Sequence, residues 1–212
     1  MASPRSWISS VRVAICRARA SSISASRTAA WMLVLALVPL CATAAGPDRD
    51  PVLREKLQAA LREPLAFADH YEAEVWLTDM AGRLARKVPD PAERLEILTT
   101  VHREASRAGL PPEMILAVID VESGFQRYAV SRANAQGLMQ IMRFWLTELD
   151  MPGFALLDVR ENVRMGCTIL RHYYDLENGN WTRTLARYNG SVGSRAYPDL
   201  VFERLRTRWF QQ

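Results

Sequence analysis

Apolar residues recur at intervals of three and four along most of the chain, the spacing that places them on one face of an α-helix. Residues 125–136 lack this periodicity, and we expect them to form a loop. No stretch alternates between apolar and polar residues as a half-buried strand does. The pattern predicts an all-α (mainly α) fold. The expected helices cover residues 64–87, 90–109, 111–123, 137–150, 160–179, 181–189 and 198–210.

The segment 90–109 has the clearest boundary signals. Asp90 can cap the start of a helix, Pro91 suits its first turn, and Gly109 can end it. The pattern predicts a domain over residues 90–212 with a helical N-terminal extension over residues 45–89. The buried face of the 90–109 helix is expected to consist of Leu95, Leu98, Val101, His102 and Ala105.

Residues 1–44 have the pattern of a signal peptide. Residues 29–40 form an apolar block that is too short to span a membrane as a helix, and five arginines but no acidic residue precede it. The sequence Ala-Thr-Ala at residues 42–44 is typical of a cleavage site. We expect cleavage after residue 44 and export to the periplasm. Because Leu40 stands where a small residue precedes a lipidated cysteine, we favour simple cleavage over a lipoprotein.

Removal of this leader changes the charge of the chain. The full sequence carries a net charge of +4, but 22 basic and 23 acidic residues remain after residue 44, a net charge of about −1. The composition therefore gives no support for a nucleic-acid-binding surface. Of three cysteines only Cys167 lies beyond the leader, so it has no internal partner for a disulfide. Its apolar neighbours predict a buried, unreactive thiol.

A lone carboxylate, Glu122, continues an apolar stripe. Ile115, Val118 and Ile119 precede it by seven, four and three residues, so the four side chains share one helix face. Burial and the negative end of the helix dipole both disfavour the charged form there and raise the pKa. A carboxylic acid that stays protonated near neutral pH can act as the general acid in glycoside cleavage. The ordinary alternative is a solvated glutamate at a helix end.

Four motifs follow one another from this glutamate onward: ESGFQ, AVSRANAQGLMQIM, ENVRMG and ARYNG. In this order and at these distances they resemble the lytic transglycosylases of the soluble-murein-transglycosylase (SLT) type, over roughly residues 111–198. The resemblance implies a lysozyme-like α-helical domain. It also implies an enzyme that cleaves peptidoglycan between N-acetylmuramic acid and N-acetylglucosamine.

By this resemblance Glu122 is the sole catalytic acid and base. Ser123 would face the N-acetyl group of the sugar, Gln140 would bind substrate, and the hydroxyl of Tyr188 would lie near the glutamate and the substrate. Tyr197 is a looser match to a second aromatic residue of the family. The further residues that the resemblance implies are Met139 and Asn189 for substrate binding, and Gly137, Leu138, Asn162 and Gly166 as structural motif positions.

Several of these residues have ordinary alternative roles. Ser123 could hydrogen-bond a free backbone group at the helix end. Leu138 and Met139 could be core residues, and Gly137 could serve backbone conformation alone. Asn162 could simply favour a helix start, and Asn189 followed by glycine is also an ordinary turn signal.

The sequence departs from the family pattern at three positions. Asn134 stands where glycine is usual, Arg143 where a proline is usual, and Arg187 where a small residue is usual. Because asparagine tolerates left-handed backbone better than most residues, we expect the loop around Asn134 to keep its conformation.

The family mechanism needs one carboxylate because the substrate supplies the second group and the product is a 1,6-anhydro sugar. A lysozyme-type hydrolase on the same fold would need another carboxylate, and Asp150, Asp158 and Asp175 are available along the chain. A non-catalytic glycan-binding or assembly protein is the other alternative.

We expect no cofactor and no metal, because the three histidines are scattered and His70 with Glu74 would supply only two ligands. The expected partners are peptidoglycan glycan strands and no nucleic acid, and we expect a monomer. The extension over residues 45–89 is a candidate docking segment for an envelope protein.

Overall fold

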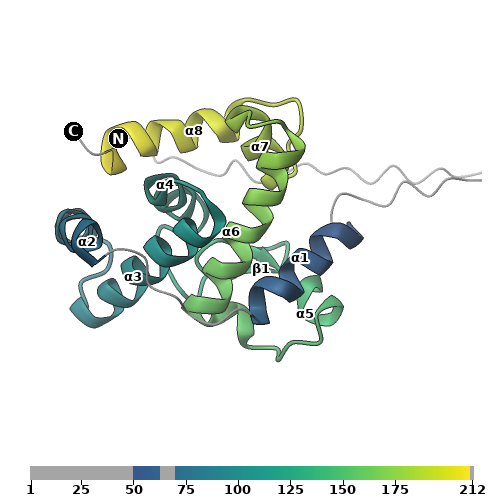
Figure 1. Ribbon diagram of the computed structural model, residues 1–212, viewed down its shortest axis with the longest axis horizontal. Helices are drawn as coiled ribbons and strands as arrows, with labels where there is room; N and C mark the ends of the chain where they lie inside the picture. Colours follow the sequence, from purple (N-terminus) through teal and green to yellow (C-terminus); the bar gives the residue numbers. More distant parts are fainter. Residues whose placement is uncertain (1–49, 63–69, 211–212) are drawn as a thin grey trace, which may run out of the picture. The chain divides into compact units, whose positions relative to one another are not determined.

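The computed structural model describes residues 50–62 and 70–210 (Figure 1). The expected signal peptide over residues 1–44 lies outside the described residues. The described part holds eight α-helices and a sheet of two short strands, which confirms the mainly α prediction. The elements in chain order are α1 (Pro51–Arg62), α2 (His70–Leu84), α3 (Pro91–Ala108), α4 (Pro112–Glu122), β1 (Ala135–Gln136), β2 (Ile141–Met142), α5 (Phe144–Glu148), the 3-10 turn η2 (Ala155–Leu157), α6 (Val159–Leu176), α7 (Trp181–Tyr188), α8 (Ala196–Arg204) and the π-helical turn η3 (Leu205–Trp209).

Helix α3 begins and ends where the sequence predicts. The Asp90 carboxylate accepts a hydrogen bond of 2.9 Å from the backbone N–H of Ala92, which satisfies one free donor of the first turn. At the other end Gly109 takes a left-handed φ of 62°, and its N–H bonds the carbonyls of the last turn.

The buried face of α3 differs in part from the prediction. Leu98, Val101 and Ala105 are buried as expected, but Leu95 is 54% exposed. Ile97 and Glu104 are fully buried instead, so the inner face is turned toward them. A hydrophobicity pattern misses this rotation because it assigns a charged residue such as Glu104 to the solvent side.

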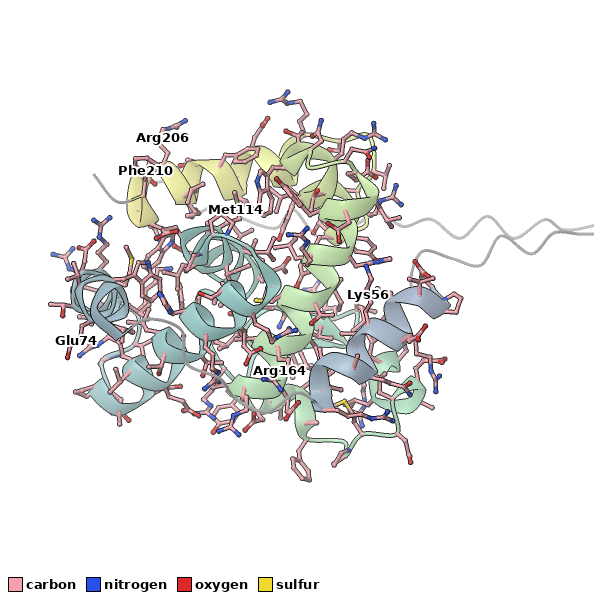
Figure 2. The ribbon with its side chains drawn as sticks, in the orientation of Figure 1. Lys56, Glu74, Met114, Arg164, Arg206 and Phe210 are labelled. Atoms are coloured by element: carbon pink, nitrogen blue, oxygen red, sulfur yellow. The ribbon has the colours of Figure 1, made fainter. Side chains whose placement is uncertain are left out.

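Glu104 is buried because arginines surround it. The Arg164 guanidinium of α6 donates to both carboxylate oxygens at 3.0 Å, and Arg107 donates at 2.8 Å (Figure 2). Burial alone would raise the pKa of Glu104, but the hydrogen bonds from these arginines hold it below its ordinary value. Arg164 also donates to the Ala60 carbonyl of α1 at 3.0 Å. One charge cluster thereby ties α1, α3 and α6 together.

The prediction of a helix over residues 137–150 is wrong for its first half. Helix α5 begins only at Phe144, and Ile141–Met142 pairs with Ala135–Gln136 as β2 and β1. Gly137 and Gln140 have φ values of 78° and 51°, a left-handed conformation that a right-handed helix cannot contain. Strands of two residues are too short to show alternation in a sequence, so no pattern predicts them.

The turn over residues 137–140 lies directly against α6. A Cβ added to Gly166 would stand 2.2 Å from the Met139 Sδ atom and 2.9 Å from its Cβ. A Cβ added to Gly137 would stand 2.2 Å from the Leu156 carbonyl oxygen. Both glycines are therefore required by close approach, and Gly137 by its positive φ as well.

Asn162 fixes the same turn to α6 by hydrogen bonds. Its side-chain oxygen accepts from the backbone N–H of Met139 at 2.8 Å, and its amide nitrogen donates to the carbonyls of Gln136 and Leu156 at 2.8 and 2.9 Å. The side chain is almost completely buried, so these three bonds replace the water it gives up. Asn162 is thus a buried connector between the turn and the helix.

Helices α1 and α2, which belong to the expected N-terminal extension, contribute to the same hydrophobic core as the rest. Leu57 of α1 and Met80 of α2 are fully buried in it. The indole N–H of Trp76 donates to the Glu113 carboxylate at the start of α4, at 2.7 Å. The expected domain boundary at residue 90 therefore falls inside one continuous core.

Asp120 fastens the C-terminal turn η3. Its buried carboxylate accepts hydrogen bonds from Arg208 at 3.0 Å and from the Trp209 indole at 3.2 Å, and it pairs with Lys87. The Asp120 side chain is thus engaged with the C-terminal turn, away from Glu122, as helical spacing requires.

No helix in the described part of the chain has the length and apolar character needed to cross a membrane. Cys167 is fully buried in α6, and burial raises the pKa of its thiol far above the usual range. This is the unreactive environment that the sequence predicts.

The contact between Gly166 and Met139 predicts opposite effects for two glycine substitutions. Gly166→Ala forces a methyl group against the Met139 side chain, and we expect it to lower the free energy of unfolding by about 1–3 kcal/mol. Gly82→Ala in α2 places its methyl group in open space, and we expect a gain of about 0.5–1 kcal/mol. Urea denaturation of both variants and the wild type measures the change in free energy of unfolding. Equal changes in the two variants would contradict the close packing of Gly166 against Met139.

Candidate active site

Glu122 is the last residue of α4, and its carboxyl group faces a cavity of about 320 Å³. Burial raises the pKa of Glu122 from 4.5 to about 7, while a hydrogen bond from Tyr197 acts in the opposite direction. The Tyr197 hydroxyl donates to the Glu122 Oε1 atom at 2.6 Å. The carboxyl group is therefore poorly solvated, has one side-chain hydrogen bond, and is about half protonated near neutral pH.

The cavity is built from four parts of the chain. Alongside Glu122 it is lined by the predicted residues Gln140, Tyr188 and Asn189, so the structure brings these four together. The other lining residues lie outside the predicted set of site residues. They are Ser131, Ala133, Ala135, Ile141, Met142, Trp145, Ile169, Tyr173 and Gly190.

Among these unpredicted residues, Trp145 and Tyr173 supply aromatic surface and Ser131 supplies a hydroxyl group. Helical spacing on α5 and α6 predicts only that the two aromatic residues are inward-facing. Which of the inward-facing residues meet the cavity depends on the β1–β2 turn, which the sequence pattern does not predict. Ser131 lies in a loop without periodicity, within the motif AVSRANAQGLMQIM, and the resemblance assigns it no role of its own.

The hydroxyl groups of Tyr197 and Tyr188 donate hydrogen bonds to different partners. Tyr197 bonds Glu122 directly, whereas the Tyr188 hydroxyl donates to the Met139 carbonyl oxygen at 2.8 Å. Burial and the nearby Glu122 charge raise the pKa of both phenols, so both stay protonated and act as donors. The residue with the looser sequence match is thus the one that touches the carboxyl group.

Ser123 and Gln140 make hydrogen bonds within the protein. The Ser123 hydroxyl donates to the Leu138 carbonyl at 2.8 Å and accepts from the Phe125 backbone N–H at 3.2 Å. This is the ordinary role at a helix end, and it also joins α4 to the 137–140 turn. The Gln140 amide nitrogen donates to the Gly137 carbonyl at 2.9 Å and still borders the cavity.

Met139 and Leu138 are core residues in this structure. Both side chains are buried, and neither lines the cavity. The sulfur atom of Met139 occupies the space that Gly166 leaves open on α6, and substrate binding by Met139 stays a prediction. Met139 serves the site through its backbone, which bonds Tyr188 and Asn162.

The three departures from the family pattern are accommodated. Asn134 has a φ of 63°, the left-handed conformation expected of the glycine it replaces. Arg143 has helical φ and ψ at the start of α5, so the absence of proline does not block that helix. Arg187 donates to the buried Glu177 carboxylate at 2.7 Å, and its guanidinium is thereby held outside the set of residues lining the cavity.

Glu122 is the one carboxylate that lines this cavity among the described residues. Asp158 caps α6 and borders a different groove, and Asp175 pairs with Arg171 at 2.8 Å. Asp150 is likewise absent from the cavity lining. Within residues 50–62 and 74–210, whose side chains the structure describes, no group of three histidine, cysteine or acidic residues could hold a metal ion. The chemistry of the site therefore rests on a single acid.

The fold and this site define a helical domain with one catalytic-type glutamate, and comparison with known families agrees. Residues 99–197 match the Transglycosylase SLT domain, a segment that contains Glu122, Tyr188 and Tyr197. This match confirms the resemblance noted in the sequence, over the segment that holds the four motifs from Glu122 onward.

Two relatives are both named membrane-bound lytic murein transglycosylase C. The protein from Yersinia pestis (strain Pestoides F) is 32% identical over 113 residues, which cover 46% of this chain and 32% of the relative. The protein from Actinobacillus pleuropneumoniae serotype 5b is 49% identical over 47 residues, which cover 22% of this chain and 13% of the relative. The matched segments thus span less than one third of each relative. A solved structure, an inactive mutant of lytic transglycosylase Slt from Pseudomonas aeruginosa, aligns with a TM-score of 0.41 and 28% identity over 50% of this chain and 20% of that one.

The raised pKa of Glu122 predicts a pH-dependent cost to stability. Because the folded protein holds this proton more tightly than the unfolded chain, stability is lost as the pH rises from 4.5 through about 7. Glu122→Gln removes the ionisation, so we expect the variant to gain up to about 3 kcal/mol relative to the wild type between about pH 4 and pH 8. Urea denaturation of both proteins at about pH 4 and pH 8 measures this gain. If the difference in free energy of unfolding between Glu122→Gln and the wild type is the same at both pH values, the raised pKa is contradicted.

Proposed function

We propose that this protein is a peptidoglycan lytic transglycosylase. It cleaves the β-1,4 bond between N-acetylmuramic acid and N-acetylglucosamine and forms a 1,6-anhydro end on the muramic acid. The observation that carries the proposal is a single carboxyl group, Glu122, with a pKa of about 7 in a cavity lined by no other carboxylate among the described residues. The match to the SLT domain and the names of the two relatives support the substrate class.

In the first step the protonated Glu122 donates its proton to the bridging oxygen as the bond to C1 of the muramic acid breaks. The 2-acetamido group of the same sugar stabilises the positive charge that develops at C1. Tyr197 donates to Oε1, which stabilises the carboxylate that remains and leaves Oε2 to face the substrate. The residue that lowers the pKa of Glu122 thus also supports its charged form after the proton has left.

In the second step the Glu122 carboxylate removes the proton of the C6 hydroxyl, and O6 bonds C1 of the same sugar. The protons balance, because Glu122 donates one proton to the leaving oxygen and takes one from the C6 hydroxyl. No water is consumed. An intramolecular attack of this kind benefits from high effective molarity, which suits a site with only one carboxylate.

Two other functions compete with this one. A hydrolase on the same fold needs a second carboxylate to activate water, and the cavity lining offers none within the described residues. A binding protein without activity needs no buried acid with a raised pKa, which costs stability to maintain. The geometry therefore favours the transglycosylase over both.

We further propose that the enzyme acts in the cell envelope, after export to the periplasm and cleavage near residue 44. The support is the leader pattern of the sequence and the membrane-bound description of the relatives. A contact with an envelope protein through residues 45–89 belongs to the same proposal, as does a monomeric state. Val52 and Val75, which are 53% and 70% exposed on α1 and α2, are apolar positions available to such a contact.

A digest of purified peptidoglycan tests the reaction. We expect mass spectrometry to find anhydromuramyl products with the wild-type protein and a loss of at least about a thousandfold in rate with Glu122→Gln, because the only acid and base is removed. Glu113→Gln, which changes a carboxylate on the first turn of the same helix, is the matched control and should keep most of the activity.

Products with a reducing end, one water heavier, would replace the transglycosylase with a hydrolase. A folded protein that binds glycan and releases nothing would make it a binding protein. Retained activity in Glu122→Gln would remove Glu122 from the mechanism.

A further inference from the structure

A second groove, larger than the Glu122 cavity, lies on another part of the molecule. It has a volume of about 840 Å³ and is bordered by α3, the loop at residues 127–128, the segment 151–158 and the first turn of α6. None of its lining residues borders the Glu122 cavity. Both hollows nevertheless flank one loop, because Tyr128 lines the groove and Ser131 lines the cavity.

Three of the side chains that line this groove each have one polar atom that is buried without a partner in the protein. These atoms are the Nη2 atom of Arg103, the Nε atom of Arg127 and the Oε2 atom of Glu161. They make up half of the six such side-chain atoms found within residues 50–62 and 74–210, although the groove involves only fourteen lining residues. Since an unpartnered buried polar atom costs about 1–3 kcal/mol, their gathering in one groove points to a ligand with both acceptors and donors.

The charges of the groove are balanced. Three arginines face it together with three carboxylates: Arg103, Arg127, Arg160, Glu96, Asp158 and Glu161. Burial and the neighbouring Asp158 raise the pKa of Glu161 above its ordinary value. A groove of this composition does not attract a polyanion or a polycation, and it suits a neutral ligand that both donates and accepts hydrogen bonds.

Two aromatic side chains stand exposed at the groove. Tyr128 is 69% exposed and Phe154 is 73% exposed, and both belong to the groove lining. The Arg127 guanidinium lies 5.2 Å from the centre of the Tyr128 ring and supports it. Exposed rings beside fixed polar groups offer a flat apolar face and a hydrogen-bonding edge, the two surfaces that a pyranose ring also presents.

We propose that this groove is a second, non-catalytic binding site for a saccharide, and that it holds N-acetylated glycan chains while Glu122 acts on a chain in its own cavity. Sugar hydroxyl and acetamido groups would supply the acceptors for Arg103 and Arg127 and the donor for Glu161. Tyr128 and Phe154 would contact the sugar faces. The identity of the saccharide rests on the proposed function, whereas the existence of the groove as a binding site does not.

Titration of the Glu122→Gln protein with tetra-N-acetylchitotetraose, followed by NMR, tests the site. We expect amide shifts at residues 127–128 and 154, separate from those around residues 140 and 189, with different dissociation constants. In the same background Phe154→Ala should weaken the groove binding about five- to tenfold and leave the cavity binding unchanged. Phe210→Ala is the matched control, because Phe210, labelled in Figure 2, is an exposed phenylalanine that does not line the groove and should alter neither constant.

Shifts at the cavity alone would overturn the second site and leave the proposed function intact. Shifts at the groove with a free peptidoglycan stem peptide, but none with the saccharide, would overturn the saccharide assignment and give the groove to a peptide. Shifts at neither place would contradict the second site and count against the glycan cavity as well. Equal weakening by Phe154→Ala and Phe210→Ala would show that the loss is not specific to the groove, and would also contradict the proposal.

Discussion

The poor solvation of one carboxyl group is the constraint on which the site depends. Glu122 ends a helix whose other face-sharing residues are buried, and its one side-chain hydrogen bond comes from Tyr197. Water that reached both oxygens freely would return its pKa toward 4.5 and remove the proton that glycoside cleavage needs. For the proposed function, the cavity must therefore be open enough to admit a sugar and closed enough to keep the acid neutral. Holding it there costs stability above neutral pH, a trade that active sites often make.

The rest of the structure keeps the walls of that cavity in place. Gly166 lets Met139 sit against α6, Asn162 holds the backbone of the same turn, and Tyr188 bonds that backbone from α7. Ser123 joins the turn to the end of α4, one residue from Glu122. These residues therefore contact mostly one another, and they support the wall of the cavity without a hydrogen bond to the Glu122 carboxyl group. The charge cluster of Glu104 and its arginines plays the corresponding part farther away, where it fixes α6 against α1 and α3.

The sequence predicts the parts of this structure that follow from local physics. Helix periodicity and the end signals Asp90 and Gly109 locate α3, and the stripe before Glu122 predicts the burial that raises its pKa. Asn134 takes the left-handed backbone expected of it. What the sequence does not predict depends on contacts between distant segments. The turn over residues 137–140 exists because α6 and Asn162 hold it, Glu104 is buried because Arg164 reaches it, and Tyr197 meets Glu122 from 75 residues away. No window of local sequence contains both partners of these contacts.

The most direct test of the account is the pKa of Glu122 itself. Carbon-13 labelling of the glutamate carboxyl groups, with Glu122→Gln to assign the signal, allows its titration to be followed by NMR. We expect a midpoint of about 7 in the wild type and a higher one in Tyr197→Phe, because that variant removes the hydrogen bond that favours the carboxylate. Tyr188→Phe, whose lost hydroxyl bonds Met139, should change the midpoint less. A wild-type midpoint near 4.5 would mean that Glu122 is an ordinary solvated carboxylate, and it would contradict the assignment of Glu122 as the general acid.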